Sequence, residues 1–132
     1  MEGGVEIGLK LSNMTHSELI WLVGFYEGEG SCGCYRKTSY SKAGEKYVYP
    51  HGSLTVTIAQ KDRQIIDWIQ KKLGYGSVRI RPQKSTSLGG SVWIWNACHS
   101  DAYRFLRLIR PYLKINRRKV QLAKALKRYE AK

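Results

Sequence analysis

The sequence predicts a single α+β domain in which helices cover one face of a four-stranded sheet. The chain has 132 residues, of which 42% are hydrophobic and 25% are charged, as is typical of one globular domain. Segments with the two-residue period of strands occur in pairs, and segments with helical character separate and flank these pairs. The expected order is α-β-β-α-β-β-α-α, which favours an antiparallel or mixed sheet over a parallel one.

The first helix is expected to begin after Thr15, within a domain that covers residues 15–132. Residues 1–14 are rich in glycine and lack a clear period, so we expect them to form an N-terminal arm. Thr15 and Glu18 have the spacing of a capping box. The run from Leu19 to Tyr26 is apolar on every side, which predicts a helix that is buried all round. A domain of this size rarely buries a helix completely, so one side is expected to pack on a second copy of the chain.

The remaining elements follow from alternation, capping residues and turn residues. In the segment 52–59, Leu54, Val56 and Ile58 alternate with serine and threonine. The segment 91–98 is apolar on both faces, which leaves open which face Trp93 and Trp95 occupy. Strands are expected at 31–40, 52–59, 77–82 and 91–98, and loops at 41–50 and 84–90. One helix is expected to be capped by Asp62, to run to about Leu73 and to end at Gly74 and Gly76. The next is expected to be capped by Ser100 or Asp101 and to run to about Arg110, and the last to be capped by Asn116 and to run to about Tyr129.

The charge of the chain indicates a polyanionic partner. There are 23 Lys and Arg against 10 Asp and Glu, which gives a net charge of +13. Residues 1–34 hold one base and five acids, whereas residues 35–100 hold eleven bases and three acids, and residues 101–132 hold eleven bases and two acids. Nucleic acid is the favoured partner. A solvated basic surface is the alternative, and no segment has the amphipathic character of a membrane-surface helix.

One face of the predicted sheet carries hydrogen-bonding and basic side chains. Such groups in rows can contact base edges and phosphates in a DNA groove. An ordinary solvated sheet face is the alternative. The residues expected on this face are Tyr35, Lys37, Ser53, Thr55, Thr57, Arg79 and Arg81.

Two acids end the first helix, in the segment Glu27-Gly28-Glu29-Gly30. The carbonyl end of a helix carries a partial negative charge and favours cations, so two carboxylates there are unfavourable unless a positive group joins them. Carboxylate and carbonyl oxygens are ligands that suit Mg²⁺. Salt bridges to Arg or Lys are the alternative.

The segment 21–30, Trp-Leu-Val-Gly-Phe-Tyr-Glu-Gly-Glu-Gly, resembles the signature motif of the LAGLIDADG homing endonucleases. The αββαββα order of that family covers about residues 15–130. Leu54 to Gln60 resembles the second strand of the family, Gly76 to Arg81 resembles the third strand, and residues 111–115 resemble the exit of the third helix. The chain has one copy of the motif, which in this family implies a homodimer on a long pseudo-palindromic site.

The resemblance implies a Mg²⁺-dependent, site-specific double-strand DNA endonuclease with a DNA-binding saddle opposite its helices. Mn²⁺ is expected to substitute for Mg²⁺, and Ca²⁺ is expected to bind without supporting cleavage. By position in the motif, Glu29 and the carbonyl of Gly28 correspond to metal ligands, and Gln60 corresponds to a residue that organises water. Asn116 stands where relatives often hold a lysine, so Lys114 or Arg117 is the candidate replacement.

The candidate residues can therefore be grouped by expected role. Catalysis is assigned to Glu29, Gln60 and Lys114, and metal binding to Glu29 and Gly28. DNA contact is assigned to the residues of the sheet face and also to Arg117, at the start of the last helix. The expected contact surface between two copies consists of Ile20, Gly24, Glu27 and Gly28, where two glycines four residues apart would let helices approach closely.

Other interpretations remain at this point. The same fold could bind nucleic acid without cleaving it, as a maturase on intron RNA or as a DNA-binding regulator. A basic interaction protein without nucleic acid is a third interpretation. Three cysteines, no secretory pattern and no apolar run of about 20 residues predict an intracellular protein. The resemblance implies an organelle (chloroplast or mitochondrion) or a bacterial, archaeal or phage cytoplasm, without a choice between them. The spacing of Cys32, Cys34, Cys98 and His99 disfavours zinc and favours free thiols.

Overall fold

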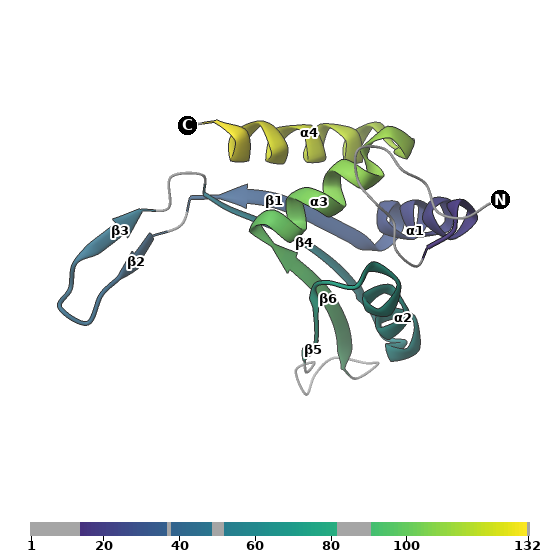
Figure 1. Ribbon diagram of the computed structural model, residues 1–132, viewed down its shortest axis with the longest axis horizontal. Coiled ribbons are helices and arrows are strands. Elements are labelled where there is room, and N and C mark those ends of the chain that lie inside the picture. Colours follow the sequence, from purple (N-terminus) through teal and green to yellow (C-terminus); the bar gives the residue numbers. More distant parts are fainter. Residues whose placement is uncertain (1–13, 37, 49–51, 82–90, 132) are drawn as a thin grey trace.

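The computed structural model describes residues 14–36, 38–48, 52–81 and 91–131, so the arm predicted at 1–14 and the turn predicted at 84–90 lie almost wholly outside the described residues. Within the described part of the chain, no helix is both long enough and apolar enough to cross a membrane. In chain order (Figure 1) the elements are α1 (His16–Glu29), β1 (Gly30–Tyr35), β2 (Thr38–Tyr40), β3 (Lys46–Val48), β4 (Ser53–Gln60), α2 (Arg63–Leu73), β5 (Ser77–Arg81), β6 (Val92–Cys98), α3 (His99–Ile109), the 3₁₀ helix η1 (Arg110–Tyr112) and α4 (Asn116–Glu130).

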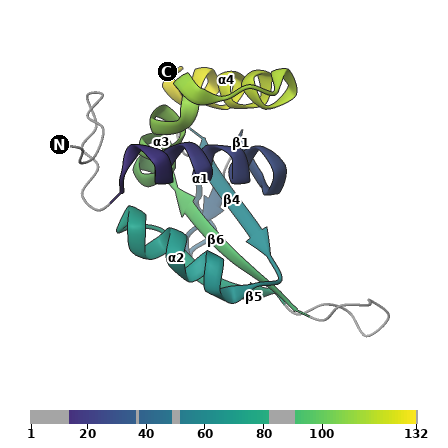
Figure 2. The same cartoon turned by 90° about the vertical axis from the view of Figure 1, so that its right-hand side faces the viewer.

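The central sheet has four antiparallel strands in the order β1-β4-β6-β5, which confirms the predicted α+β class. All four helices contribute to one hydrophobic cluster with the inward side chains of β4 and β6. Figure 2 looks onto the helical side, with α1 and α2 in front of the strands. Among the described residues, no helix lies on the opposite face of the sheet, and the polar residues that the sequence predicts there lie on this face, apart from Lys37, which is outside the described residues.

Helix α1 packs one side on the core of the chain, as expected, and exposes the other; the packing of that side on a second copy stays a prediction. Leu19, Leu22 and Tyr26 are fully buried, whereas the side chains of Ile20 and Trp21 are 42% and 46% exposed. The predicted capping box is confirmed: the Glu18 N–H donates to Thr15 Oγ1 at 3.1 Å, and the Thr15 N–H donates to Glu18 Oε1 at 2.9 Å. The core of the chain thus covers one side of this helix, and apolar side chains on its other side are exposed.

The region expected as one strand and a loop forms a separate two-stranded hairpin instead. β1 ends at Tyr35, and β2 pairs with β3 in a small antiparallel sheet that extends away from the body of the molecule (Figure 1). The turn closes through the Ser41 N–H, which donates to the Glu45 carbonyl at 2.9 Å, and Gly44 adopts a φ of +85°. β3 holds only three exposed residues with no buried face, so the sequence carries no alternation signal for it.

Two predicted helix caps are also wrong. Helix α3 begins at His99, directly after β6, and neither Ser100 nor Asp101 caps it, because His99 itself makes the turn with a φ of +56°. Asn116 is the first residue of α4 rather than its cap, which is Ile115. The structure also shows which face the two tryptophans occupy. Both lie on the core side: Trp95 is fully buried, Trp93 is partly buried against the core, and the Trp95 Nε1 donates to the Tyr75 carbonyl at 3.0 Å.

Candidate functional site

The two acids that end α1 lie in opposite environments. The Glu27 side chain is only 7% exposed, and its Oε2 accepts the backbone N–H groups of Lys114 and Ile115, each at 2.6 Å. The Glu27 backbone carbonyl accepts Nε of Arg118 at 3.0 Å. This residue therefore fastens the end of α1 to the segment that leads into α4. It is buried within the single chain, and its expected place in a contact between copies stays a prediction.

Glu29 is exposed, two residues further along, where α1 passes into β1. Helix geometry leaves the carbonyls of the last turn without intrahelical partners. Two of them are satisfied here, because the Tyr26 carbonyl accepts the Gly30 N–H and the Glu27 carbonyl accepts Arg118. Gly28 is exposed, and a Cβ placed on it would have no atom within 4 Å. An exposed carboxylate and a nearby backbone carbonyl are oxygen donors of the kind that a hard divalent cation takes.

One copy of the chain supplies few ligands at this point. Among the described residues, no group of three or more His, Cys, Asp or Glu could hold a metal ion. A magnesium ion commonly binds one or two protein carboxylates and completes its octahedral shell with water and substrate phosphate. The donor set at the end of α1 fits that pattern, with further ligands from outside the chain.

The backbone brings the other two catalytic candidates to the same end of α1. Gly30, the residue after Glu29, pairs with Ile58, so the end of β4 at Gln60 lies beside the end of α1. The Gln60 Oε1 accepts the Lys61 N–H at 2.8 Å. Lys114 is exposed, and its backbone is held at the Glu27 carboxylate. The three candidates thus converge through the sheet register and the Glu27 anchor.

The uncovered face of the sheet carries the polar residues that the sequence predicts. Directly paired residues of antiparallel strands share a face. Tyr35 pairs with Ser53, Thr55 pairs with Cys98, and Thr57 pairs with Asn96, while the alternate residues of β4 are buried in the core. By the same register, Arg79 and Arg81 project from this face on β5, and Lys37 lies outside the described residues.

Two residues of this face were not found from the sequence. Asn96 lies between Thr57 and Ser77 in the register, and its Oδ1 accepts the Ser77 hydroxyl at 3.0 Å. Its Nδ2 lies 3.8 Å from Cys98 Sγ. The apolar residues on both sides of β6 hid the alternation that places Asn96 and Cys98 outward.

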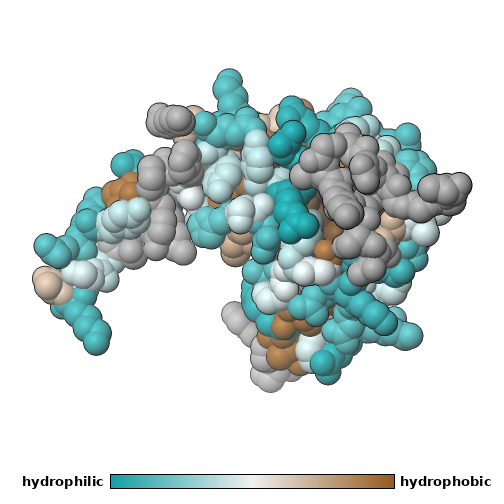
Figure 3. Space-filling view, viewed as in Figure 1, coloured by the Kyte–Doolittle hydropathy of each residue, from teal (hydrophilic) through white to brown (hydrophobic). Residues whose placement is uncertain are grey.

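The space-filling view shows a hollow between the projecting hairpin and the body of the molecule (Figure 3). The hairpin exposes Tyr40 and Tyr47, at 67% and 53%. The hairpin therefore forms one wall of this hollow. Arg117, in the first turn of α4, lines a groove between β1 and α4, and its expected DNA contact stays a prediction.

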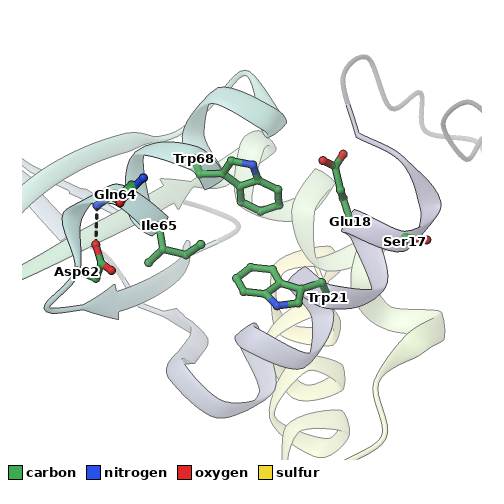
Figure 4. Close-up of a pocket in the computed structure, with 7 residues that line it drawn as sticks. All are labelled: Ser17, Glu18, Trp21, Asp62, Gln64, Ile65 and Trp68. Atoms are coloured by element: carbon green, nitrogen blue, oxygen red, sulfur yellow. Dashed lines mark hydrogen bonds between the residues drawn. The ribbon is translucent and has the colours of Figure 1, made fainter.

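An aromatic pocket of about 440 Å³ lies beside the exposed side of α1 (Figure 4). Trp21 reaches across from α1 to Trp68 of α2, with ring centroids 5.4 Å apart and rings nearly perpendicular. Trp21 also stacks on Phe25, with centroids 5.1 Å apart. Ile20, Gly24 and Gly28, spaced four residues apart, continue this exposed surface along the helix. The open flank of α1 is thus apolar and free of bulky side chains at its two glycines.

The sequence matches the family described as LAGLIDADG endonuclease over residues 22–103. This range includes most of the motif, the whole sheet and part of α3, and it spans more than half of the chain. The chain therefore belongs to the LAGLIDADG endonuclease family, which confirms the resemblance seen in the motif. A search of curated proteins found no match.

Solved homing endonucleases share the fold. I-SmaMI bound to uncleavable DNA is similar with a TM-score of 0.62 and 23% identity, over 83% of this chain and 35% of that chain. I-CvuI in complex with its target is similar with a TM-score of 0.59 and 22% identity, over 81% of this chain and 62% of that chain. I-TnaI has a TM-score of 0.58 and 21% identity, over 88% of this chain and 71% of that chain. The chain thus spans less than two thirds of the length of I-CvuI.

Proposed function

We propose that the protein is a site-specific double-strand DNA endonuclease that acts as a homodimer with divalent metal. The observation that carries this proposal is the contrast between the two motif acids. Glu27 is buried and bound to the backbone, whereas Glu29 is exposed at the junction of α1 and β1. The negative end of a helix disfavours a carboxylate, and Glu29 does not bind backbone N–H groups as Glu27 does. Glu29 is therefore a candidate catalytic residue rather than a structural one.

Glu29 and the Gly28 carbonyl would hold the metal, with Mg²⁺ as the expected ion and Mn²⁺ as its substitute. When bound, the ion would stabilise charge on the attacking and leaving oxygens of the phosphodiester. The Gln60 amide would orient the attacking water, and Lys114 would place a positive charge near the scissile phosphate. Arg117 is less favoured as the replacement for the missing lysine, because it lines the groove beside β1. Structures of I-CvuI were obtained with calcium on its target and with magnesium on uncleaved DNA, which supports a divalent ion.

The homodimer would form through the open flank of α1. A surface that joins Ile20 and Trp21 to two exposed glycines is apolar enough to favour a partner, since soluble proteins rarely leave such patches uncovered. A second copy packed on this surface would bring its own Glu29 near the first. Each strand of the duplex would then meet one set of catalytic residues.

The DNA would lie against the polar face of the sheet. The net charge of +13 supplies the attraction to phosphate, and the side chains of Ser53, Thr55, Thr57, Arg79 and Arg81 offer hydrogen bonds to base edges. Arginine bound to guanine by two hydrogen bonds is the commonest specific contact in the major groove. I-SmaMI and I-CeuI, which share the fold, are described in complex with DNA.

A second candidate function is nucleic-acid binding without cleavage, as in a maturase or a regulator. Asn116 favours it. This residue follows Ile115, whose N–H binds the Glu27 carboxylate, and an amide at this position cannot supply the charge of a lysine. A randomised duplex library, incubated with the protein in Mg²⁺ or in Ca²⁺ and then sequenced, separates the two functions. Endonuclease activity predicts cut sequences that share one pseudo-palindrome in Mg²⁺ and bound, uncut sequences in Ca²⁺. Enrichment of bound sequences without cutting in Mg²⁺ would favour the second function.

A further inference from the structure

A second basic feature lies at the edge of the sheet, beside β1. A groove of about 860 Å³ runs between this edge and helix α4. In Figure 1, α4 lies along one side of β1, and the hairpin and the lower strands extend to the other side. The groove shares Gly33 and Tyr35 with the β1 end of the polar face, whereas its basic residues all belong to α4.

The walls of the groove are basic and contain no acid. Its basic residues are Arg117, Lys124, Lys127 and Arg128 of α4. Arg117, Lys124 and Arg128 follow the spacing i, i+7, i+11, so they share one stripe over three helical turns, about 16 Å along the axis. In the part of the chain that the structure describes, none of the four forms an ion pair. The one acid of α4, Glu130, accepts the Tyr103 hydroxyl at 2.7 Å instead.

The floor and rim of the groove are apolar and aromatic. Val120 of α4 is 58% exposed, and Tyr35 at the end of β1 is 62% exposed. The Tyr35 ring lies over Gly33, where a Cβ would collide with it, so the glycine makes room for the ring along the strand. Burial raises the pKa of the Cys34 thiol in the floor, which keeps the thiol neutral near pH 7. The groove therefore combines uncompensated positive charge with exposed apolar surface.

We propose that the groove between β1 and α4 binds an unpaired nucleic-acid strand along the edge of the sheet, through basic residues of α4 that the polar face does not include. Basic grooves lined by aromatic side chains accommodate single strands, because the phosphates meet the cations and the unstacked bases meet the apolar surface. A duplex presents phosphates but keeps its bases stacked, so it would leave the exposed Val120 and the apolar floor of the groove unused. This inference does not rest on the cleavage activity and holds for either function considered above.

The test compares two triple variants with the same net charge. Lys124→Gln/Lys127→Gln/Arg128→Gln removes charge from the groove, and Lys71→Gln/Arg110→Gln/Lys119→Gln removes three exposed charges outside it. Fluorescence anisotropy measures binding of a labelled 12-nucleotide RNA, a DNA strand of the same sequence, its duplex and a polyglutamate peptide over a series of salt concentrations. Circular dichroism checks that both variants are folded.

The proposal predicts that the groove variant loses at least about tenfold affinity for single strands while the control variant loses much less. The slope of log affinity against log salt should fall by about 0.7 for each phosphate contact removed, or about 2 in all. Comparison of the RNA and DNA strands then shows which sugar the groove prefers. Equal losses in the two variants, a groove variant that loses duplex binding as strongly, or tighter binding of polyglutamate than of single strands would overturn the proposal. Cleavage of duplex by the groove variant is scored separately, so failure of this site and failure of the proposed endonuclease are distinguishable.

Discussion

Replacing Glu27 with glutamine is expected to destabilise the protein, whereas the same change at Glu29 should leave its stability nearly unchanged. The two residues have the same side chain, lie two positions apart on the same helix and differ in what they contact. Glu27 is 7% exposed and accepts two backbone N–H groups, while Glu29 is exposed. The pair therefore separates a structural acid from an acid that folding does not use.

The size of the effect follows from the two hydrogen bonds at Glu27. Hydrogen bonds to a charged group contribute about 1.5–3 kcal/mol each, and charge-assisted bonds are roughly twice as strong as neutral ones. A glutamine oxygen can still accept both N–H groups, so Glu27→Gln should lower the free energy of unfolding by about 2 kcal/mol. Glu27→Ala leaves the Lys114 and Ile115 N–H groups without this acceptor and should cost about 3–5 kcal/mol. An exposed substitution such as Glu29→Gln should stay within about 0.5 kcal/mol of the wild-type protein.

Urea denaturation followed by circular dichroism measures these differences. The slope m, the dependence of the unfolding free energy on urea concentration, should be similar in the wild-type protein and the three variants. A change in the midpoint then reports a change in stability. Because Glu27 fastens the segment that carries Lys114, hydrogen exchange at residues 113–116 should also accelerate in Glu27→Gln more than elsewhere in the chain. Equal stability of Glu27→Gln and Glu29→Gln would refute the structural assignment of Glu27.

Three further predictions concern base recognition, assembly and thiol reactivity. Arg79→Ala should relax sequence preference at one position of each half-site, by about 1–3 kcal/mol, in a bound-library assay; uniform weakening at all positions would mark Arg79 as a phosphate contact instead. Gly24→Leu should place a side chain where two helices meet and dissociate the dimer in sedimentation, at a cost of about 1–3 kcal/mol per site, and a wild-type protein that stays monomeric on its DNA would contradict this. Cys98 is exposed and should be alkylated by iodoacetamide at pH 8 well before Cys32 and Cys34, because burial raises the pKa of both buried thiols; mass spectrometry that finds equal modification of the folded protein would oppose this order.

The parts of the fold that the sequence predicts well are those with strong local signals. The capping box at Thr15, the Asp62 cap of α2 and the Gly74 stop are each confirmed, because each depends on a few neighbouring residues. The Asp62 Oδ1 accepts the Gln64 N–H at 3.0 Å, and Gly74 adopts the left-handed conformation at a φ of +81°. The alternation in β4 is equally clear because one of its faces is fully buried.

The features that the sequence does not predict depend on distant contacts. The start of α4 is held by Glu27, a residue nearly 90 positions earlier, so no local pattern around Asn116 reveals it. In the hairpin, β3 has no buried face and therefore no periodic pattern. The motif identifies both acids but does not show which one is buried. That distinction, on which the proposed catalytic role of Glu29 depends, comes from the hydrogen bonds that Lys114, Ile115 and Arg118 donate to Glu27.

The measurement that tests the account most directly is cleavage of a library-selected target by Glu29→Gln beside the wild-type protein. In Mg²⁺, the wild-type protein should convert the target duplex to two fragments. Glu29→Gln should bind the same duplex with an affinity within about threefold of the wild-type value, because its charge does not contact the base edges, and it should yield no fragments. Cleavage by Glu29→Gln at the wild-type rate would contradict the assignment of Glu29 and, with it, the proposed mechanism.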